Sequence, residues 1–233
     1  MELKQSDPPR QRIRWRTCYR IIPSRFPPID LFERVTDRDD LAAVHELESL
    51  TNDRLRDQRG EIRIVPPEDR LVGPGAAYVM AAFTHPAPAG ARFSDSRIGA
   101  YYAAHRLETA IAETTFHRAA FMRATREPPM ELDMRVLEAE IDARLHDIRG
   151  MGERLSAIYD PDDYSAAQRF AARLRAEGSD GVIYDSVRHV GGQCVAIFRP
   201  RRLRGCRESL HLTYVWDGSR IARVYEKREL PDA

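Results

Sequence analysis

Cysteine, lysine and long apolar runs are scarce in this sequence of 233 residues. The three cysteines, Cys18, Cys194 and Cys206, form no CxxC pair, and an odd number of thiols fits a reduced protein better than a disulfide framework. The chain has no run of 18 apolar residues, so we expect no membrane-spanning helix. No apolar stretch follows the basic N-terminus, and we therefore expect no secretory signal and a cytoplasmic location.

An excess of charge of either sign is also missing. The sequence has 37 lysine and arginine residues and 36 acidic ones, which gives a net charge of +1. A protein dedicated to nucleic acid is usually strongly basic, so no direct nucleic-acid contact is expected. Only Lys4 and Lys227 are lysines, so a single arginine is weak evidence for a phosphate site. Hydrophobic residues make up 42% of the chain, which is ordinary for a globular protein.

Common enzyme motifs are absent, namely GxGxxG, GxxxxGK[ST], GxSxG and HExxH. Two pairs, His105 with Glu108 and Glu113 with His117, have the spacing that places both side chains on one face of a helix. A zinc site normally needs a third protein ligand, and the sequence points to none. We therefore interpret both as polar surface pairs and expect no metal.

The apolar pattern predicts an α+β fold with a mixed β core and flanking helices. Residues 1–16 are predicted to be a mobile basic arm, and residues 17–233 a single domain with an N-terminal helical elaboration to about residue 75. One helix is predicted from Asp37 to Gly60 and another over residues 107–121. Residues 76–83 are predicted to form a strand or a buried helical turn.

Alternation and turn residues predict the strands of the C-terminal half. Ser165 and Gln168 form a predicted capping box that opens a helix closed by Gly178. Asp217-Gly218 has the composition of a hairpin turn. The predicted strands cover residues 100–103, 130–136, 181–185, 193–198, 212–216 and 220–225.

Four polar or aromatic residues lie where predicted strands and helices could bring them to one cleft. Arg92 precedes a turn, Tyr102 lies on the next strand, Glu113 lies on the following helix, and Ser186 lies at another strand end. A plainer interpretation pairs Arg92 with Glu113 in an ordinary ion pair, buries Tyr102 in the core, and lets Ser186 close a hairpin. Spacing alone favours the plainer interpretation.

Three segments, RFSDSRIGAYYAA, ETAIAET and GVIYDSVRHVGGQCVAIFRP, together resemble the RES domain, whose members are the toxin half of bacterial toxin–antitoxin pairs. The family takes its name from an arginine, a glutamate and a serine, which Arg92, Glu113 and Ser186 match. Tyr102 matches the tyrosine of the following strand better than Tyr101 does. The resemblance extends over nearly the whole chain beyond about residue 15, so it implies one RES domain over residues 17–233.

The resemblance implies a fold similar to diphtheria-toxin-type ADP-ribosyltransferases and NAD⁺ as the substrate, cleaved at the nicotinamide–ribose bond. Nicotinamide leaves as a neutral molecule, so one carboxylate can serve where glycosidases use two. Glu113 would stabilise the developing positive charge, orient the ribose hydroxyls or activate an acceptor. Arg92 would bind the pyrophosphate with two hydrogen bonds, Tyr102 would stack on nicotinamide, and Ser186 would bind its amide or ribose.

The acceptor of the ADP-ribosyl group stays open. Water or phosphate would make the protein an NAD⁺ glycohydrolase or phosphorylase, whereas a host protein side chain would make it a mono-ADP-ribosyltransferase. The resemblance also implies an Xre-like antitoxin as partner. The alternative is a catalytically inactive RES-like module that contacts DNA or a partner protein through an arginine-rich surface. That surface would consist of Arg199, Arg201, Arg202, Arg204 and Arg207.

Overall fold

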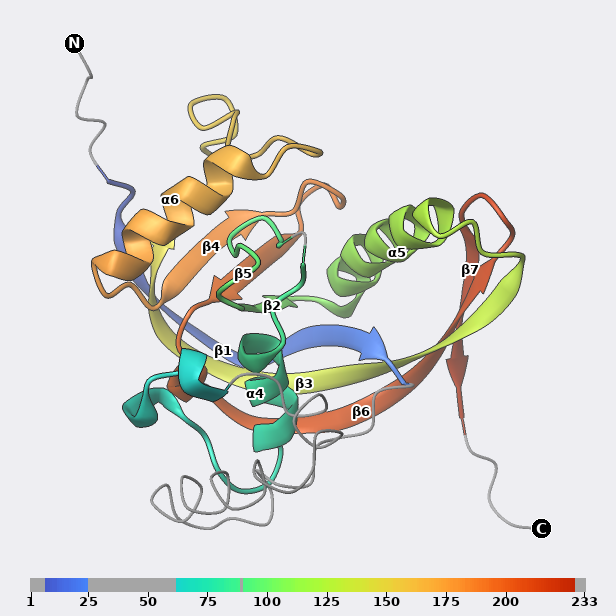
Figure 1. The fold of residues 1–233 in the computed structure, drawn as a ribbon, viewed down its shortest axis with the longest axis horizontal. Coiled ribbons are helices and arrows are strands. Elements are labelled where there is room, and N and C mark those ends of the chain that lie inside the picture. The colour runs from blue at the N-terminus through green and yellow to red at the C-terminus, as the bar shows by residue number, and fades with distance from the viewer. Residues whose placement is uncertain (1–6, 25–61, 89, 229–233) are drawn as a thin grey trace.

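The computed structural model describes residues 7–24, 62–88 and 90–228, and these residues form an α+β fold around one twisted sheet (Figure 1). The strand order is β1-β2-β5-β4-β3-β6-β7, and β1 pairs with β3 as well. The α+β prediction is therefore confirmed. The strands are β1 (Arg10–Pro23), β2 (Tyr101–Ala104), β3 (Met130–Asp147), β4 (Gly181–Asp185), β5 (Gln193–Ile197), β6 (Leu203–Trp216) and β7 (Ile221–Lys227).

Helices cover both faces of this sheet. Helix α4 (Ala76–Thr84) packs on one face, and α5 (Leu107–Ala124) and α6 (Ser165–Ala176) pack on the other (Figure 1). Three short 3₁₀ turns complete the described elements, η1 (Ile62–Ile64), η2 (Pro67–Asp69) and η3 (Pro200–Arg202). The helix predicted from Asp37 to Gly60 lies outside the described residues. No helix in the described ranges is long and apolar enough to cross a membrane.

Strand β1 corrects the prediction of a mobile arm over residues 1–16. From Arg10 onward the chain pairs with β3 in antiparallel register, with Ile13 opposite Ala143 and Trp15 opposite Ile141. Ile13 and Trp15 are each 8% exposed, whereas Arg12, Arg14 and Arg16, which alternate with them, face solvent. This alternation of apolar and basic residues is the period of a half-buried strand, so residues 10–16 belong to the sheet.

Two antiparallel strand pairs build the right side of the sheet in Figure 1. Strand β3 runs antiparallel to β6, and β6 turns back into β7 at Asp217-Gly218, as the sequence predicts. The Asp217 carboxylate accepts hydrogen bonds from the backbone N–H groups of Ser219 and Arg220, which closes this turn. The predicted strands at 130–136, 212–216 and 220–225 are therefore correct in position, although β3 and β6 are much longer.

The short strand β2 divides its two tyrosines between opposite faces of the sheet. Tyr101 is fully buried on the face covered by α4, where its hydroxyl lies 3.9 Å from Sγ of Cys206. Tyr102 lies on the face that α5 and α6 cover. Strand β2 leads through His105 and Arg106 directly into α5, so the alternation along β2 decides which tyrosine lies near that helix.

Candidate functional site

Arg92 lies at the tip of a tight turn. Ala91 and Ser94 pair with each other in an isolated bridge, so this turn spans 91–94. The hydroxyl of Tyr102 accepts a hydrogen bond from the backbone N–H of Phe93 at 2.8 Å and lies 3.1 Å from Oγ of Ser94. Burial raises the pKa of Tyr102, so its hydroxyl stays protonated and holds this turn against β2.

Helix α6 holds the same turn from a second side. The side-chain amide of Gln168 donates to the carbonyl of Ala91 at 3.1 Å, and the Arg175 guanidinium donates to the carbonyls of Phe93 and Gly99. Gln168 therefore does not serve the predicted capping box, and the Asp163 carboxylate instead accepts a hydrogen bond from the backbone N–H of Ser165 at the start of α6. The helix itself is predicted correctly, and it ends before Gly178, which has a φ of +73°.

The Arg92 side chain is buried, with 6% of the residue exposed, and its hydrogen bonds are to the 158–160 loop. Its Nη1 donates to the carbonyl oxygens of Ile158 and Asp160 at 2.8 and 2.7 Å. Its guanidinium carbon lies 4.6 Å from the centre of the Tyr164 ring. Its Nη2 is buried and has no hydrogen-bond partner. Arg92 therefore anchors the 158–160 loop and keeps one donor atom unused.

Glu113 lies on α5 with 19% of its side chain exposed. Its Oε1 accepts a hydrogen bond from Oγ of Ser186 at 2.5 Å, and Sγ of Cys194 lies 3.9 Å from the same oxygen. Burial, followed by the charge of Glu113, raises the pKa of the Cys194 thiol well above its ordinary value, so the thiol is a donor. The carboxylate is thus held from the sheet side by two donors.

Besides orienting Glu113, Ser186 also holds the β4–β5 loop in place. Its hydroxyl oxygen accepts hydrogen bonds from the backbone N–H groups of Arg188 and His189, at 3.1 and 2.9 Å. The loop packs tightly on the first turn of α5, because a Cβ atom at Gly192 would lie 2.6 Å from Cγ2 of Thr109. These contacts place Ser186 at the end of β4 in direct reach of the helix.

His117 lies against Glu113, and the Phe116 ring packs edge-on against the His117 ring. Nε2 of His117 lies 4.0 Å from Oε2 of Glu113, and 49% of the His117 side chain is exposed. The Arg188 guanidinium stacks on the Phe116 ring, 3.3 Å from its centre, and donates to the carbonyl of Pro161. The sequence pattern predicts Glu113 and His117 to be a polar surface pair, and the structure places the half-exposed His117 against the largely buried Glu113 carboxylate.

The contacts join the four predicted residues into two groups: Tyr102 holds the turn that carries Arg92, and Ser186 holds Glu113. Tyr184 of β4 connects them, because its ring packs edge-on against Phe93 with centres 4.9 Å apart. Its pKa is raised well above the ordinary value by burial, and by the charge of Glu113, while Arg92 opposes that shift. Both charges therefore act on the same side chain. Arg92 and Glu113 nevertheless form no ion pair with each other within the described part of the chain, so the plainer interpretation of that pair fails.

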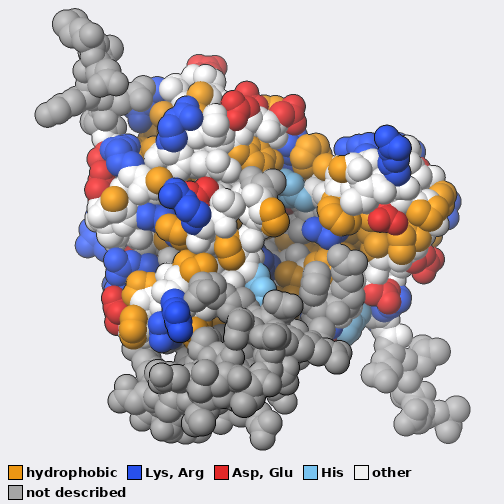
Figure 2. Space-filling model, viewed as in Figure 1, with side chains coloured by type: hydrophobic (Ala, Val, Ile, Leu, Met, Phe, Trp, Pro, Cys, Tyr) orange, Lys and Arg blue, Asp and Glu red, His pale blue; other side chains and the backbone are white. Residues whose placement is uncertain are grey.

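The surface near α5 is hollowed. On the face shown in Figure 2, a depression separates the lobe that carries α5 from the larger lobe that carries α6, and histidine and basic side chains border it.

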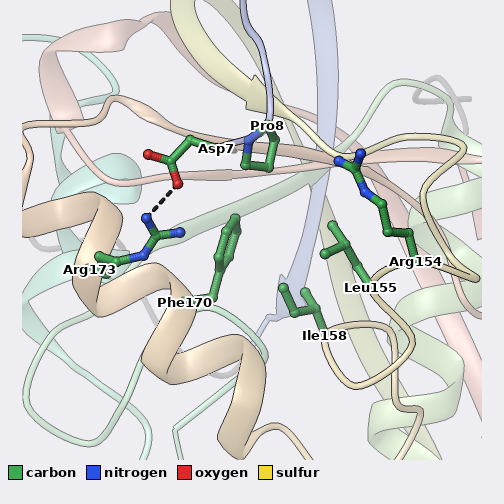
Figure 3. A pocket seen from close by; sticks show the side chains of 7 residues that line it. All are labelled: Asp7, Pro8, Arg154, Leu155, Ile158, Phe170 and Arg173. Carbon is green, nitrogen blue, oxygen red and sulfur yellow. Dashed lines mark hydrogen bonds and ion pairs between the residues drawn. The ribbon is translucent and has the colours of Figure 1, made fainter. Parts of the chain in front are cut away.

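A small pocket lies elsewhere, between the N-terminal segment, α6 and the loop before it (Figure 3). Phe170, Leu155 and Ile158 form its apolar wall, and Arg173 pairs with Asp7 at its rim. None of the four predicted residues lines it. Ile158 nevertheless links the two places, because its side chain lines the pocket while its carbonyl holds Arg92.

The arginine-rich run around η3 is largely neutralised within the chain. Arg201 pairs with Asp69 at 2.8 Å and Arg202 pairs with Asp180 at 2.8 Å. Arg207 pairs with Glu138. Three of the five arginines predicted to form a nucleic-acid surface are therefore engaged with carboxylates, which weakens the binding-module alternative. Among the described residues, no group of three or more histidine, cysteine, aspartate or glutamate side chains could hold a metal ion.

Comparisons with known proteins agree with the sequence resemblance. The family model of the RES domain matches residues 67–217. The uncharacterized protein y4oC of Sinorhizobium fredii (strain NBRC 101917 / NGR234) is 34% identical over 213 residues, which cover 89% of this chain and 86% of that protein. A chain in the crystal structure of the M. tuberculosis MbcT–MbcA toxin–antitoxin complex is 15% identical, with 86% of both chains covered and a TM-score of 0.47.

Proposed function

Because the chain belongs to the RES-domain family, we propose that it is the toxin of a toxin–antitoxin pair and that it cleaves NAD⁺ at the nicotinamide–ribose bond. The family membership supports the first part of this proposal. The second part is supported by the hydrogen bond from Ser186 to Glu113 and by the hydrogen bond that ties Tyr102 to the turn carrying Arg92.

The observation that carries the proposal is the carboxylate of Glu113, held in place by Ser186. When the bond from C1′ to the nicotinamide nitrogen breaks, both bonding electrons leave with nicotinamide, which becomes neutral, and positive charge develops on the ribose. A fixed carboxylate beside that carbon stabilises this charge without having to reorganise. No general acid is needed, so one carboxylate suffices.

The contacts of Arg92 leave fewer donors for the substrate than the predicted pair of hydrogen bonds to pyrophosphate requires. Its Nη1 is already engaged with Ile158 and Asp160, and Nη2, which is buried and has no partner, would become a donor for a phosphate oxygen only if the covering side chains move aside. A single charge-assisted hydrogen bond to a phosphate is then within its reach. Arg92 therefore orders the loop and offers one contact to the dinucleotide.

Tyr102 and Ser186 act mainly through other groups. The Tyr102 hydroxyl is taken up by its hydrogen bonds to the 91–94 turn, which leaves its ring as the surface for nicotinamide. The Ser186 hydroxyl proton is directed to Glu113, so Ser186 is a positioning residue that orients the carboxylate. The predicted contact from Ser186 to nicotinamide would require this hydrogen bond to break.

The family resemblance supports an Xre-like antitoxin as the partner, and the acceptor is water, phosphate or a host protein. Purified protein incubated with NAD⁺ should release nicotinamide, and mass spectrometry of the products should identify the acceptor.

Expression without the antitoxin should arrest growth of a bacterial host, and co-expression should relieve the arrest. A folded protein that leaves NAD⁺ intact and binds DNA would instead support the inactive binding module.

A further inference from the structure

His117 occupies the solvent side of Glu113. The two residues are four apart on α5, so they share one face of the helix, and Nε2 of His117 lies 4.0 Å from Oε2 of Glu113. Ser186 and Cys194 approach the other carboxylate oxygen, Oε1, from the sheet. The Glu113 side chain is 19% exposed and the His117 side chain is 49% exposed. A molecule that approaches Glu113 from solvent therefore meets the imidazole.

The surroundings of His117 keep its imidazole neutral near pH 7. Its pKa lies below the ordinary 6.5 because the ring is partly desolvated. Glu113, on the same helix, opposes this shift, whereas Arg188 from the β4–β5 loop, Arg118 from α5 and Arg92 from the 91–94 turn favour it. A neutral imidazole has a nitrogen lone pair that can accept a proton.

Glu113 is poorly placed to be the proton acceptor as well. One of its oxygens already accepts the Ser186 hydrogen bond, and its negative charge is needed beside the ribose while the bond breaks. A second group that faces solvent can activate the attacking acceptor without neutralising that carboxylate. His117 is the titratable side chain in contact with Glu113 that meets this requirement.

We propose that the His117 imidazole is the general base for the acceptor, an assignment that rests on the proposed cleavage of NAD⁺. The acceptor is water or another hydroxyl group. Its oxygen forms a bond to C1′ as the C1′–nitrogen bond breaks, and the electron pair of that bond leaves with nicotinamide. One acceptor proton passes to Nε2 of His117, and the resulting imidazolium releases it to solvent. With water, the products are ADP-ribose, nicotinamide and one proton.

An anionic acceptor distinguishes this role from a structural one, because azide carries no proton to remove. His117→Ala should lower ADP-ribose formation in water on the order of 100-fold, within the range for loss of a general base. With sodium azide present, the ratio of ADP-ribosyl azide to ADP-ribose should rise at least about tenfold over the wild-type ratio, since only the water reaction needs the base. Liquid chromatography with mass spectrometry measures both products.

The pH profile provides a second readout. Wild-type ADP-ribose formation should fall as the pH drops through the pKa of His117, below 6.5, because the protonated ring cannot accept a proton. His117→Ala should lack this acidic limb. His211→Ala is the matched control, because His211 is 53% exposed in its side chain, also contacts a glutamate, and lies on β6 away from the site. It should leave rates and product ratio unchanged.

The possible failures are distinguishable. If wild-type protein releases no nicotinamide with water, azide, phosphate or a bacterial lysate, the proposed function itself is overturned, and the role of His117 falls with it. If wild-type protein is active and His117→Ala lowers both products in proportion, His117 is structural and the general-base assignment is wrong. An unchanged rate in water with His117→Ala overturns the assignment as well and leaves the proposed function standing.

Discussion

The hydroxyl of Ser186 donates a hydrogen bond to Oε1 of Glu113 across a separation of 73 residues, with the two oxygens 2.5 Å apart. The serine stands at the end of β4 and the glutamate on α5, so this bond ties the sheet to the helix at the candidate site. The same serine oxygen accepts two backbone N–H groups of its loop, which fixes the direction of the hydroxyl. The carboxylate is thereby oriented before any substrate arrives, as electrostatic stabilisation of a transition state requires.

Replacing Glu113 by glutamine separates charge from shape. Glu113→Gln should lower single-turnover nicotinamide release at saturating NAD⁺ on the order of 10²–10³-fold, the effect of losing one electrostatic stabiliser. NAD⁺ affinity should change much less, because the positive charge on the ribose develops fully only in the transition state. Thermal melting controls for folding. A near-normal rate in a well-folded variant would remove Glu113 from the catalytic centre.

Removing the Ser186 hydroxyl should impair turnover more than binding. A hydrogen bond to a charged group contributes about 1.5–3 kcal/mol, so Ser186→Ala should slow nicotinamide release about 10- to 100-fold with nearly unchanged NAD⁺ affinity. Ser186→Thr keeps a hydroxyl and should retain more activity. Ser209→Ala, on β6, is the control and should behave like wild type. Weaker NAD⁺ affinity with a normal turnover rate would instead mean that Ser186 binds the substrate directly.

Arg92 should matter for stability as well as for binding. Arg92→Ala removes the buried hydrogen bonds to Ile158 and Asp160 and should lower the free energy of unfolding by about 1.5–3 kcal/mol. It should also weaken NAD⁺ affinity about tenfold, the effect of one charge-assisted contact. Denaturant unfolding and calorimetric titration measure the two effects.

Arg175→Ala is the matched control for Arg92, because Arg175 supports the same turn through the carbonyls of Phe93 and Gly99. This variant should lose stability but keep most of its NAD⁺ affinity. If Arg92→Ala and Arg175→Ala weaken NAD⁺ binding equally, the contribution of Arg92 is to the shape of the turn alone.

The β6–β7 turn should make stability sensitive to acid. Hydrogen bonds from the Arg220 and Ser219 backbones and the Ser219 hydroxyl lower the pKa of Asp217 from 3.8 to about 2. A carboxyl with a lowered folded-state pKa contributes stability above its unfolded pKa, and this contribution is lost as the pH falls from 3.8 through about 2. The melting temperature of the wild-type protein should therefore exceed that of Asp217→Asn at pH 5, and this difference in melting temperature should shrink toward pH 2. A constant difference would contradict the assignment.

Much of the fold could be predicted from local pattern. The α5 and α6 helices, the Asp217-Gly218 hairpin and the β4 and β5 strands lie close to where periodicity and turn residues place them. Strand β1 was missed although Ile13 and Trp15 alternate with arginines, because basic residues at every other position were interpreted as an unstructured arm. The capping box at Ser165 failed because Gln168 makes a better bond to a distant backbone carbonyl than to its own helix end.

Sequence alone determined the family, and with it the identities of Arg92, Tyr102, Glu113 and Ser186 as candidate residues. It also determined that Glu113 and His117 share a helix face, because that relationship depends only on helical periodicity. Tertiary structure decided which groups those side chains meet. The bonds from Ser186 to Glu113 and from Arg92 to the carbonyls of Ile158 and Asp160 join segments more than 60 residues apart. No local pattern encodes such pairs, because they arise only when the sheet brings its strand ends and loops together.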